Sequence, residues 1–241
     1  MRVYSKTDVG MRREVNQDAY LTGELANGGI FAVVCDGMGG ANAGHIASEK
    51  TAKLIFDYVM KSFSPKMSSI AIENMLRAAV STANTEIWEL SRQNEDCFGM
   101  GTTVVAVIVI DNLAHIVHVG DSRAYLIGTS SAEKLTVDHS MVQTMVNKGE
   151  ITEDEAKTHP KKNIITRAVG VDEDILCDYN IVLKTEQAAL LICTDGLSNQ
   201  VDEEAIFNIV SKEAPDEAVN KLIEQANNNG GPDNITAVLI Y

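Results

Sequence analysis

The 241-residue sequence has few basic residues and few aromatic ones. Its 20 Lys and Arg are outnumbered by 34 Asp and Glu, which gives a formal charge of -14. A chain with this charge and no basic stripe is not expected to bind nucleic acid or an anionic membrane surface. Most of the acids are expected to be solvated surface residues. Acids that gather in one site would instead favour a divalent cation.

The four cysteines, at positions 35, 97, 177 and 193, include no CxxC pair, which argues against a zinc site or a redox pair. The sequence also lacks the GxxxxGK[ST] motif of nucleotide P-loops. No uninterrupted apolar stretch approaches the roughly 20 residues of a membrane helix. Residues 1–6 carry no apolar signal region. We therefore expect a cytoplasmic protein.

What the sequence does contain is an unusual stretch at residues 30–40, IFAVVCDGMGG. Its apolar half predicts a buried strand, and Asp36 is expected where that strand leaves the core. The glycines that follow permit backbone angles closed to other residues. Residues 190–196, LLICTDG, repeat the arrangement around Asp195. If the two strands are neighbours, the two carboxylates converge, and a divalent metal would relieve their repulsion.

Hydrophobic periodicity predicts strands separated by pairs of helices. The expected strands are 2–8, 18–22, 30–35, 102–110, 114–119, 124–127, 178–183, 188–194 and 235–240, and the expected long helices are 42–63, 69–93, 202–212 and 215–228. Residues 102–127 are interpreted as a meander of antiparallel hairpins. The polar residues 136–170, here called the flap, contain two short helical patterns and predict an insertion beside a functional site. This order indicates one α+β domain over 1–241, a sandwich of two antiparallel sheets with helices outside.

Five aspartates lie in turn-like or strand-end positions: Asp18, Asp36, Asp121, Asp195 and Asp233. Each one alone is best explained as a turn former, because Asp-Gly and Asp-Asn sequences are common in turns. Five of them together favour a shared site. Oxygen ligands without His or Cys at metal spacing indicate magnesium or manganese.

Arg13 is a candidate phosphate ligand, because a guanidinium can hold a phosphate through two parallel hydrogen bonds. The alternative is a surface arginine paired with Glu14 or Asp18. Arg12 is adjacent, and spacing does not choose between the two arginines. Ser122 has no evident histidine partner, so a serine nucleophile has little support.

Eight segments in order carry a resemblance to a known family. They are 13–18 (REVNQD), 34–40 (VCDGMGG), 99–103 (GMGTT), 119–123 (VGDSR), 138–140 (DHS), 163–170 (NIITRAVG), 194–197 (TDGL) and 231–236 (GPDNIT). Each is weak alone, and together they are very specific. The chain resembles the metal-dependent protein serine/threonine phosphatases of type 2C, in their bacterial branch. The resemblance implies a four-layer α-β-β-α sandwich with a helix pair on each outer face.

The resemblance also implies a two-metal centre holding Mn²⁺ or Mg²⁺. Asp36 would bridge the two ions, and the Gly37 carbonyl would be a ligand to one of them. Asp195 and Asp233 would complete the other. Asp121, together with Asp195, would form a weaker third site.

Two further roles follow from the same resemblance. Asp18 would support the metal ligands from behind, and Arg13 would hold the substrate phosphate. The implied reaction is hydrolysis of phosphoserine and phosphothreonine on proteins by water activated between two metals. The implied partners are phosphorylated proteins and a eukaryotic-type Ser/Thr kinase that the enzyme opposes, with no nucleic acid or membrane partner. We expect a monomer.

Two rival hypotheses remain open at this point. One is a phosphatase on the same fold that is dedicated to an anti-sigma-factor antagonist. The other is a non-catalytic regulator that binds phosphoproteins without turnover. The presence of Arg13, Asp36, Asp195 and Asp233 argues against the regulator.

Two positions depart from the pattern of bacterial relatives. Ala41 stands where they often carry a histidine that is a candidate general acid, and Gln17 stands where some carry Glu. His45 lies four residues beyond Ala41, about one helical turn of 5.4 Å away. We expect a metal-bound water, rather than His45, to protonate the leaving group. Gln17 predicts modest metal affinity.

Overall fold

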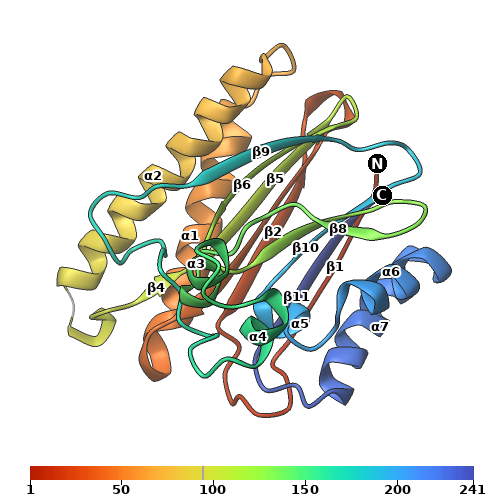
Figure 1. The fold of residues 1–241 in the computed structure, drawn as a ribbon. Coiled ribbons are helices and arrows are strands. Elements are labelled where there is room, and N and C mark those ends of the chain that lie inside the picture. The colour runs from red at the N-terminus through yellow and green to blue at the C-terminus, as the bar shows by residue number, and fades with distance from the viewer. Residues whose placement is uncertain (94) are drawn as a thin grey trace.

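Two antiparallel sheets lie face to face in the computed structural model, which describes residues 1–93 and 95–241 except for the side chains of residues 40–42 (Figure 1). The first sheet has the strand order β1 (Val3–Asp8), β11 (Ile235–Ile240), β10 (Ala189–Cys193), β7 (Arg123–Ile127) and β8 (Ala132–Lys134). The second has the order β2 (Asp18–Glu24), β3 (Ile30–Met38), β5 (Val104–Ile110), β6 (Leu113–Val119) and β9 (Asp178–Leu183), and β4 (Gly101–Thr102) pairs with β3.

Helices cover the outer faces of both sheets (Figure 1). The long helices α1 (Gly40–Ser62) and α2 (Ser69–Gln93) pack on the second sheet, and α6 (Glu203–Lys212) and α7 (Pro215–Asn228) pack on the first. Short 3₁₀ turns occupy Ala26–Gly28 and Glu95–Cys97. The flap contains α3 (Met141–Asn147) and α4 (Glu153–Thr158), and α5 (Asp195–Ser198) follows β10. The predicted α-β-β-α sandwich is confirmed.

Three apolar layers hold the sandwich together. The middle layer lies between the sheets and includes Val34, Val107, Ile192 and Val238, all fully buried. Strands covered on both faces need apolar residues at successive positions, which is why β5 has seven buried residues in a row. Burial contributes about 25 cal/mol for each Å² of apolar surface removed from water. This core packs the two sheets firmly against each other, so residues at the ends of their strands are held in fixed positions.

The connection from β6 to β7 is not the hairpin predicted from the sequence. β6 pairs with β5 and β9, whereas β7 pairs with β10 and β8 in the other sheet. Residues 120–122 therefore carry the chain from one sheet to the other. Gly120 makes this crossover possible, because its φ of +100° lies in the region that favours glycine. Local patterning could not reveal it, since a short turn looks the same whichever strand receives the chain.

The surroundings of Asp36 also differ from the prediction. The strand β3 does not end before Asp36 but continues to Met38, because Gly37 and Met38 pair with Thr102 and Gly101 of β4. Asp36 and Asp195 do not come from neighbouring strands either. Asp36 belongs to the second sheet, and Asp195 follows β10 of the first.

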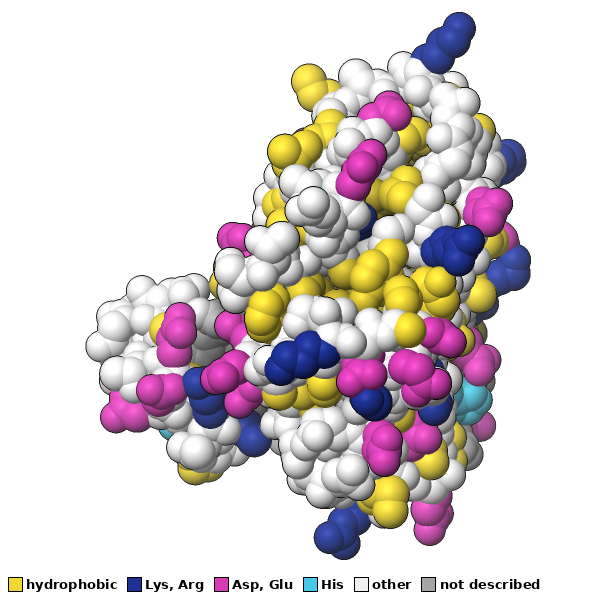
Figure 2. Space-filling view, turned by 90° about the vertical axis from the view of Figure 1, so that its right-hand side faces the viewer, with side chains coloured by type: hydrophobic (Ala, Val, Ile, Leu, Met, Phe, Trp, Pro, Cys, Tyr) yellow, Lys and Arg dark blue, Asp and Glu magenta, His cyan; other side chains and the backbone are white. Residues whose placement is uncertain are grey.

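The surface carries both signs of charge. On the face shown in Figure 2, acidic and basic side chains are interspersed, and hydrophobic side chains gather across the middle. On the edge strand β9, Ile181 and Leu183 are exposed. Among the described residues, none of the helices combines the length and apolar character that crossing a bilayer requires.

Candidate functional site

A cleft of about 640 Å³ collects residues from both sheets and from the flap. Four of the predicted acids line it: Asp36, Asp121, Asp195 and Asp233. Arg12, Arg13 and Gly37 also line it, and the flap contributes Asn163 and Ile165. Asp36 and Asp195 therefore do converge, as expected for neighbouring strands, but they come from opposite sheets.

Backbone contacts fix Asp36 at the wall of the cleft. Its amide donates to Oγ1 of Thr103 at 3.0 Å, and its carbonyl accepts from the Thr103 amide at 2.9 Å. Next to it, a Cβ on Gly37 would lie 2.1 Å from the Gly44 carbonyl oxygen. Only glycine fits there, because the helix α1 approaches the strand so closely. The packing of α1 thus explains the glycine that follows Asp36.

Asp18 lies behind the cleft, opposite Asp36 in the pairing of β2 with β3. Its Oδ2 accepts hydrogen bonds from the hydroxyls of Thr194 (2.9 Å) and Thr236 (2.7 Å). The proton of Thr236 is thereby used, so Thr7 donates to Thr236 across 2.8 Å. Oδ1 of Asp18 is buried and has no hydrogen-bond partner among the residues that the structure describes.

Burial and mutual repulsion make the carboxylates hard to ionise. Burial raises the pKa of Asp18 to about 7, and the charges of Asp195 and Asp233 add to the rise. Burial raises the pKa of Asp121 to about 8, with a further contribution from Asp195. The pKa values of Asp36 and Asp195 are raised as well, first by burial and then by neighbouring acids. Such a set needs a compensating cation when it is charged.

Arg13 has a partner that neither alternative from the sequence named. Its Nη2 donates to Oδ2 of Asp233 at 2.8 Å, and its side chain is 51% exposed. The pairing with Glu14 or Asp18 is not what the structure shows. The loop that carries Asp233 is held by Asn234, whose side-chain amide donates to the carbonyls of Val9 and Val15. Arg13 therefore lies at the mouth of the cleft beside a candidate ligand.

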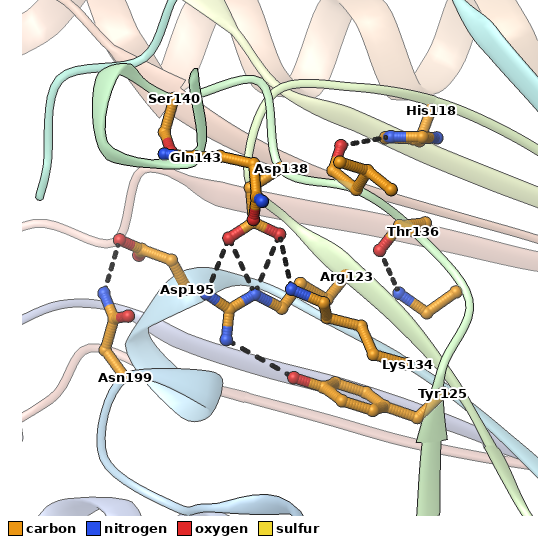
Figure 3. A network of polar contacts seen from close by, with 12 residues as sticks. His118, Arg123, Tyr125, Lys134, Thr136, Asp138, Ser140, Gln143, Asp195 and Asn199 are labelled. Carbon is orange, nitrogen blue, oxygen red and sulfur yellow. Dashed lines mark hydrogen bonds and ion pairs between the residues drawn. The ribbon is translucent and has the colours of Figure 1, made fainter. Parts of the chain in front are cut away.

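Sequence reasoning missed a buried ion pair next to the crossover (Figure 3). Nη2 of Arg123 lies 2.6 Å from Oδ2 of Asp138, and these side chains are 20% and 9% exposed. Lys134 approaches the same carboxylate at 3.7 Å, and Arg123 reaches the Tyr125 hydroxyl at 3.4 Å. The positive charge of Arg123 lowers the pKa of Asp121 and Asp195, against the larger effect of burial. The two ion-pair partners belong to two separate resemblance motifs, 119–123 and 138–140, and spacing gave no sign that they meet.

A second group of metal-ligating residue types lies near the base of the flap. One ligand atom from each of His118, His139 and Asp178 lies within 4.8 Å of the others. These residues come from β6, the flap and β9, so no sequence spacing could have revealed them. They are distinct from the five predicted aspartates.

The departure at position 41 raised the question whether His45 could act as the general acid. The side chain of Ala41 lies outside the described residues. His45 is partly buried on α1, and its Nδ1 has no hydrogen-bond partner within the described part of the chain. It is not among the described residues that line the cleft.

Known proteins match the chain along its whole length. The family model described as protein phosphatase 2C matches residues 11–239. The serine/threonine phosphatase stp of Listeria welshimeri is 37% identical, over 100% of this chain and 95% of that protein. The solved serine/threonine phosphatase of S. agalactiae is 36% identical and has a TM-score of 0.93, covering 100% of this chain and 98% of the other.

A further solved structure contains metal. It is the catalytic domain of the serine/threonine protein phosphatase PstP in complex with two manganese ions, 29% identical, with a TM-score of 0.82 over 99% of this chain and 96% of that one. With the fold, the acidic cleft and these matches in agreement, the chain belongs to the protein phosphatase 2C family and is a protein serine/threonine phosphatase.

Proposed function

We propose that this enzyme hydrolyses phosphoserine and phosphothreonine on proteins, using water activated between two divalent ions, Mn²⁺ or Mg²⁺. The observation that supports this most is the convergence of four carboxylates in one cleft beside Arg13. Burial raises the pKa values of Asp36, Asp121 and Asp195, and the buried Oδ1 of Asp18 lacks a partner among the described residues. This all-oxygen donor set fits hard divalent cations.

In this proposal the acids of the cleft would hold the metal ions. Asp36 would be shared by the two ions, the Gly37 carbonyl would be a ligand to one of them, and Asp195 and Asp233 would be ligands to the other. Asp121 and Asp195 would hold a weaker third ion. Asp18 keeps the ligands oriented and adds negative charge behind them, since the threonine hydroxyls hold its Oδ2. When bound, the ions would supply Lewis acidity and lower the pKa of a water molecule.

Arg13 binds and orients the substrate phosphate. A guanidinium has five N–H donors, and the bond to Asp233 uses one of them. The ion pair holds the side chain over the cleft, so less conformational entropy is lost when a phosphate binds. Arg13 also offsets the negative charge of the phosphoryl oxygens as the ester bond breaks.

The physiological setting of the proposal is the reversal of phosphorylation by a eukaryotic-type Ser/Thr kinase. Phosphorylated proteins are the substrates, and the enzyme works as a monomer in the cytoplasm. A bound phosphoprotein would place its phosphate against Arg13 and its flanking residues near Asn163 and Ile165 of the flap.

The test is hydrolysis of a small aryl phosphate and of phosphothreonine and phosphoserine peptides by the full chain. The protein is first stripped with EDTA and then titrated with Mn²⁺ or Mg²⁺, and bound ions are counted. We expect activity only with added metal and at least two ions per chain. Asp36→Asn and Asp195→Asn should each lower kcat by at least about 100-fold, or 2.7 kcal/mol.

The matched control is Asp57→Asn, since Asp57 is an exposed acid on α1 that pairs with Lys53. It should leave kcat and metal affinity unchanged. A metal-loaded wild type without turnover would favour the non-catalytic regulator. Turnover that survives complete metal removal would reject the two-metal proposal.

A further inference from the structure

The base of the flap is joined to the crossover between the sheets by hydrogen bonds to both backbone groups of one residue, Gly120. The amide of His139 donates to the Gly120 carbonyl at 2.9 Å, and the amide of Gly120 donates to Nδ1 of His139 at 3.1 Å. One residue of the flap therefore satisfies both backbone groups of the glycine that precedes Asp121. The ion pair of Arg123 and Asp138 continues the same junction (Figure 3).

Only glycine fits at position 120. Its φ is +100°, and a Cβ there would lie 2.6 Å from Cγ2 of Thr103. On the other side of Asp121, the hydroxyls of Ser122 and Thr103 lie 2.7 Å apart, and Thr103 also accepts the amide of Asp36. The turn that carries Asp121 is thus held on its N-terminal side by His139 and on its C-terminal side by residues that contact Asp36.

The hydrogen bonds of His139 determine its tautomer. Two donors face the ring, the Gly120 amide at Nδ1 and Nη1 of Arg167 at 3.1 Å from Nε2. A neutral imidazole accepts at one nitrogen only, and the Asp178 carboxylate beside Nε2 is an acceptor, so we assign the ring proton to Nε2. Nε2 faces Oδ2 of Asp178 at 3.3 Å, and Nη1 of Arg167 donates to Oδ1 of the same carboxylate at 2.9 Å. The ring of His118 stacks on that of His139, with centroids 4.8 Å apart. Both ring nitrogens and one face of the His139 ring therefore have assigned neighbours.

This arrangement is better explained as a positioning device than as a metal site. A metal ion on Nε2 would have to displace its proton while Nδ1 is engaged as an acceptor. Arg167 already supplies a positive charge beside Asp178, with Nη1 only 3.1 Å from Nε2 of His139.

We propose that His139 is a positioning residue that fixes the direction of the Asp121 carboxylate through the Gly120 amide. The same residue anchors the flap, because its carbonyl accepts the amide of Thr166 at 2.7 Å. The next residue, Ser140, caps α3. The functional consequence rests on the proposed role of Asp121 as a metal ligand. The hydrogen bond itself can be tested without metal.

Two substitutions separate the two ring nitrogens. In His139→Asn the side-chain oxygen can take the place of Nδ1 and accept the Gly120 amide. In His139→Gln the amide group reaches the place of Nε2, which keeps a contact to Asp178 and removes the acceptor for Gly120. If His139 acted only through packing or through Asp178, the loss of the Gly120 bond would not matter. His139→Gln would then not be more severely affected than His139→Asn.

The first measurement is made on the metal-free full chain. Long-range ¹H–¹⁵N spectra of the wild type should show His139 protonated at Nε2, and the Gly120 amide should exchange slowly with solvent. Exchange of this amide should stay slow in His139→Asn and become at least tenfold faster in His139→Gln. His115→Asn and His115→Gln are matched controls, because His115 is a buried histidine paired with the Tyr179 hydroxyl, and neither should change the exchange of Gly120.

The second measurement is a Mn²⁺ binding isotherm, with free ion counted by electron paramagnetic resonance. Removing a residue that orients a ligand typically lowers metal affinity by 10–100-fold. The weakest site should therefore lose about tenfold or more in His139→Gln and less than about threefold in His139→Asn. Protonation of His139 at Nδ1 in the wild type, or equal Gly120 exchange in both variants, would overturn the proposal even if one variant folds poorly. Changed amide exchange with an unchanged isotherm would overturn only the link to Asp121.

Discussion

Thr194 donates its hydroxyl proton to Oδ2 of Asp18 at 2.9 Å and accepts the amide of Thr236 at 3.0 Å. This relationship joins the last residue before α5 to the first residue of β2, so it connects the two sheets directly behind the cleft. It holds one carboxylate oxygen firmly and leaves the other, Oδ1, buried without a partner among the described residues. The negative charge of Asp18 would favour a cation in the cleft. In the metal-free protein the same buried charge lowers the stability of the fold.

The first prediction follows from that conflict. Asp18→Asn keeps an acceptor for the threonine hydroxyls and removes a buried negative charge, so the metal-free variant should have a higher Tm than the wild type at pH 8. Each kcal/mol gained corresponds to about 2–4 °C in a protein of this size. Mn²⁺ affinity should fall by about tenfold, because negative charge behind the ligands is lost. Calorimetry and a metal titration measure the two effects, with Asp57→Asn as the control. A lower Tm or an unchanged Mn²⁺ affinity in Asp18→Asn would contradict the prediction.

The second prediction concerns the pH dependence of the metal-free protein. Asp18 and Asp121 have pKa values of about 7 and 8 in the fold, against an ordinary value of 3.8. A raised pKa means that the folded state binds more protons, so the free energy of unfolding falls as pH rises from about 4 to 8. The Tm in EDTA should be lower at pH 8.5 than at pH 5.5, and Mn²⁺ should restore it at pH 8.5. A metal-free Tm that rises over this range would contradict the assignment.

The third prediction separates the two arginines that sequence spacing left equivalent. Arg13→Ala should lower kcat/KM for a phosphopeptide by about 10–100-fold, or roughly 1.4–2.7 kcal/mol, because Arg13 is held over the cleft by Asp233. Arg12→Ala should change it less than about threefold, and Arg13→Lys should retain an intermediate activity because a lysine cannot make two parallel bonds. Steady-state kinetics at saturating Mn²⁺ give the comparison. Equal losses for the two alanine variants would count against the assignment to Arg13.

The fourth prediction concerns the general acid. His45 is not among the described residues that line the cleft, so His45→Ala should keep most of the wild-type kcat. The pH profile of kcat should keep its shape as well. The kcat of Asp36→Asn, measured in the same assay, gives the reference for complete loss of activity. A decrease near 100-fold, about 2.7 kcal/mol, would show that His45 takes part in proton transfer.

Much of this protein follows from the sequence alone. The long helices and most strands lie within a few residues of their predicted bounds, because their hydrophobic periodicity is set by burial of one helix face or of both strand faces. The family followed from eight ordered motifs. The same motifs contain the four acids that line the cleft.

Tertiary structure decided which of these local elements meet. It takes the chain from β6 to the other sheet at Gly120, continues β3 through Asp36 with the help of β4, and brings Asp36 and Asp195 together from opposite sheets. It also pairs Arg13 with Asp233 and places His139 against Gly120. Periodicity reports which side of an element is buried. It does not identify the element that packs against the buried side, so contacts between distant segments become visible only in the folded chain.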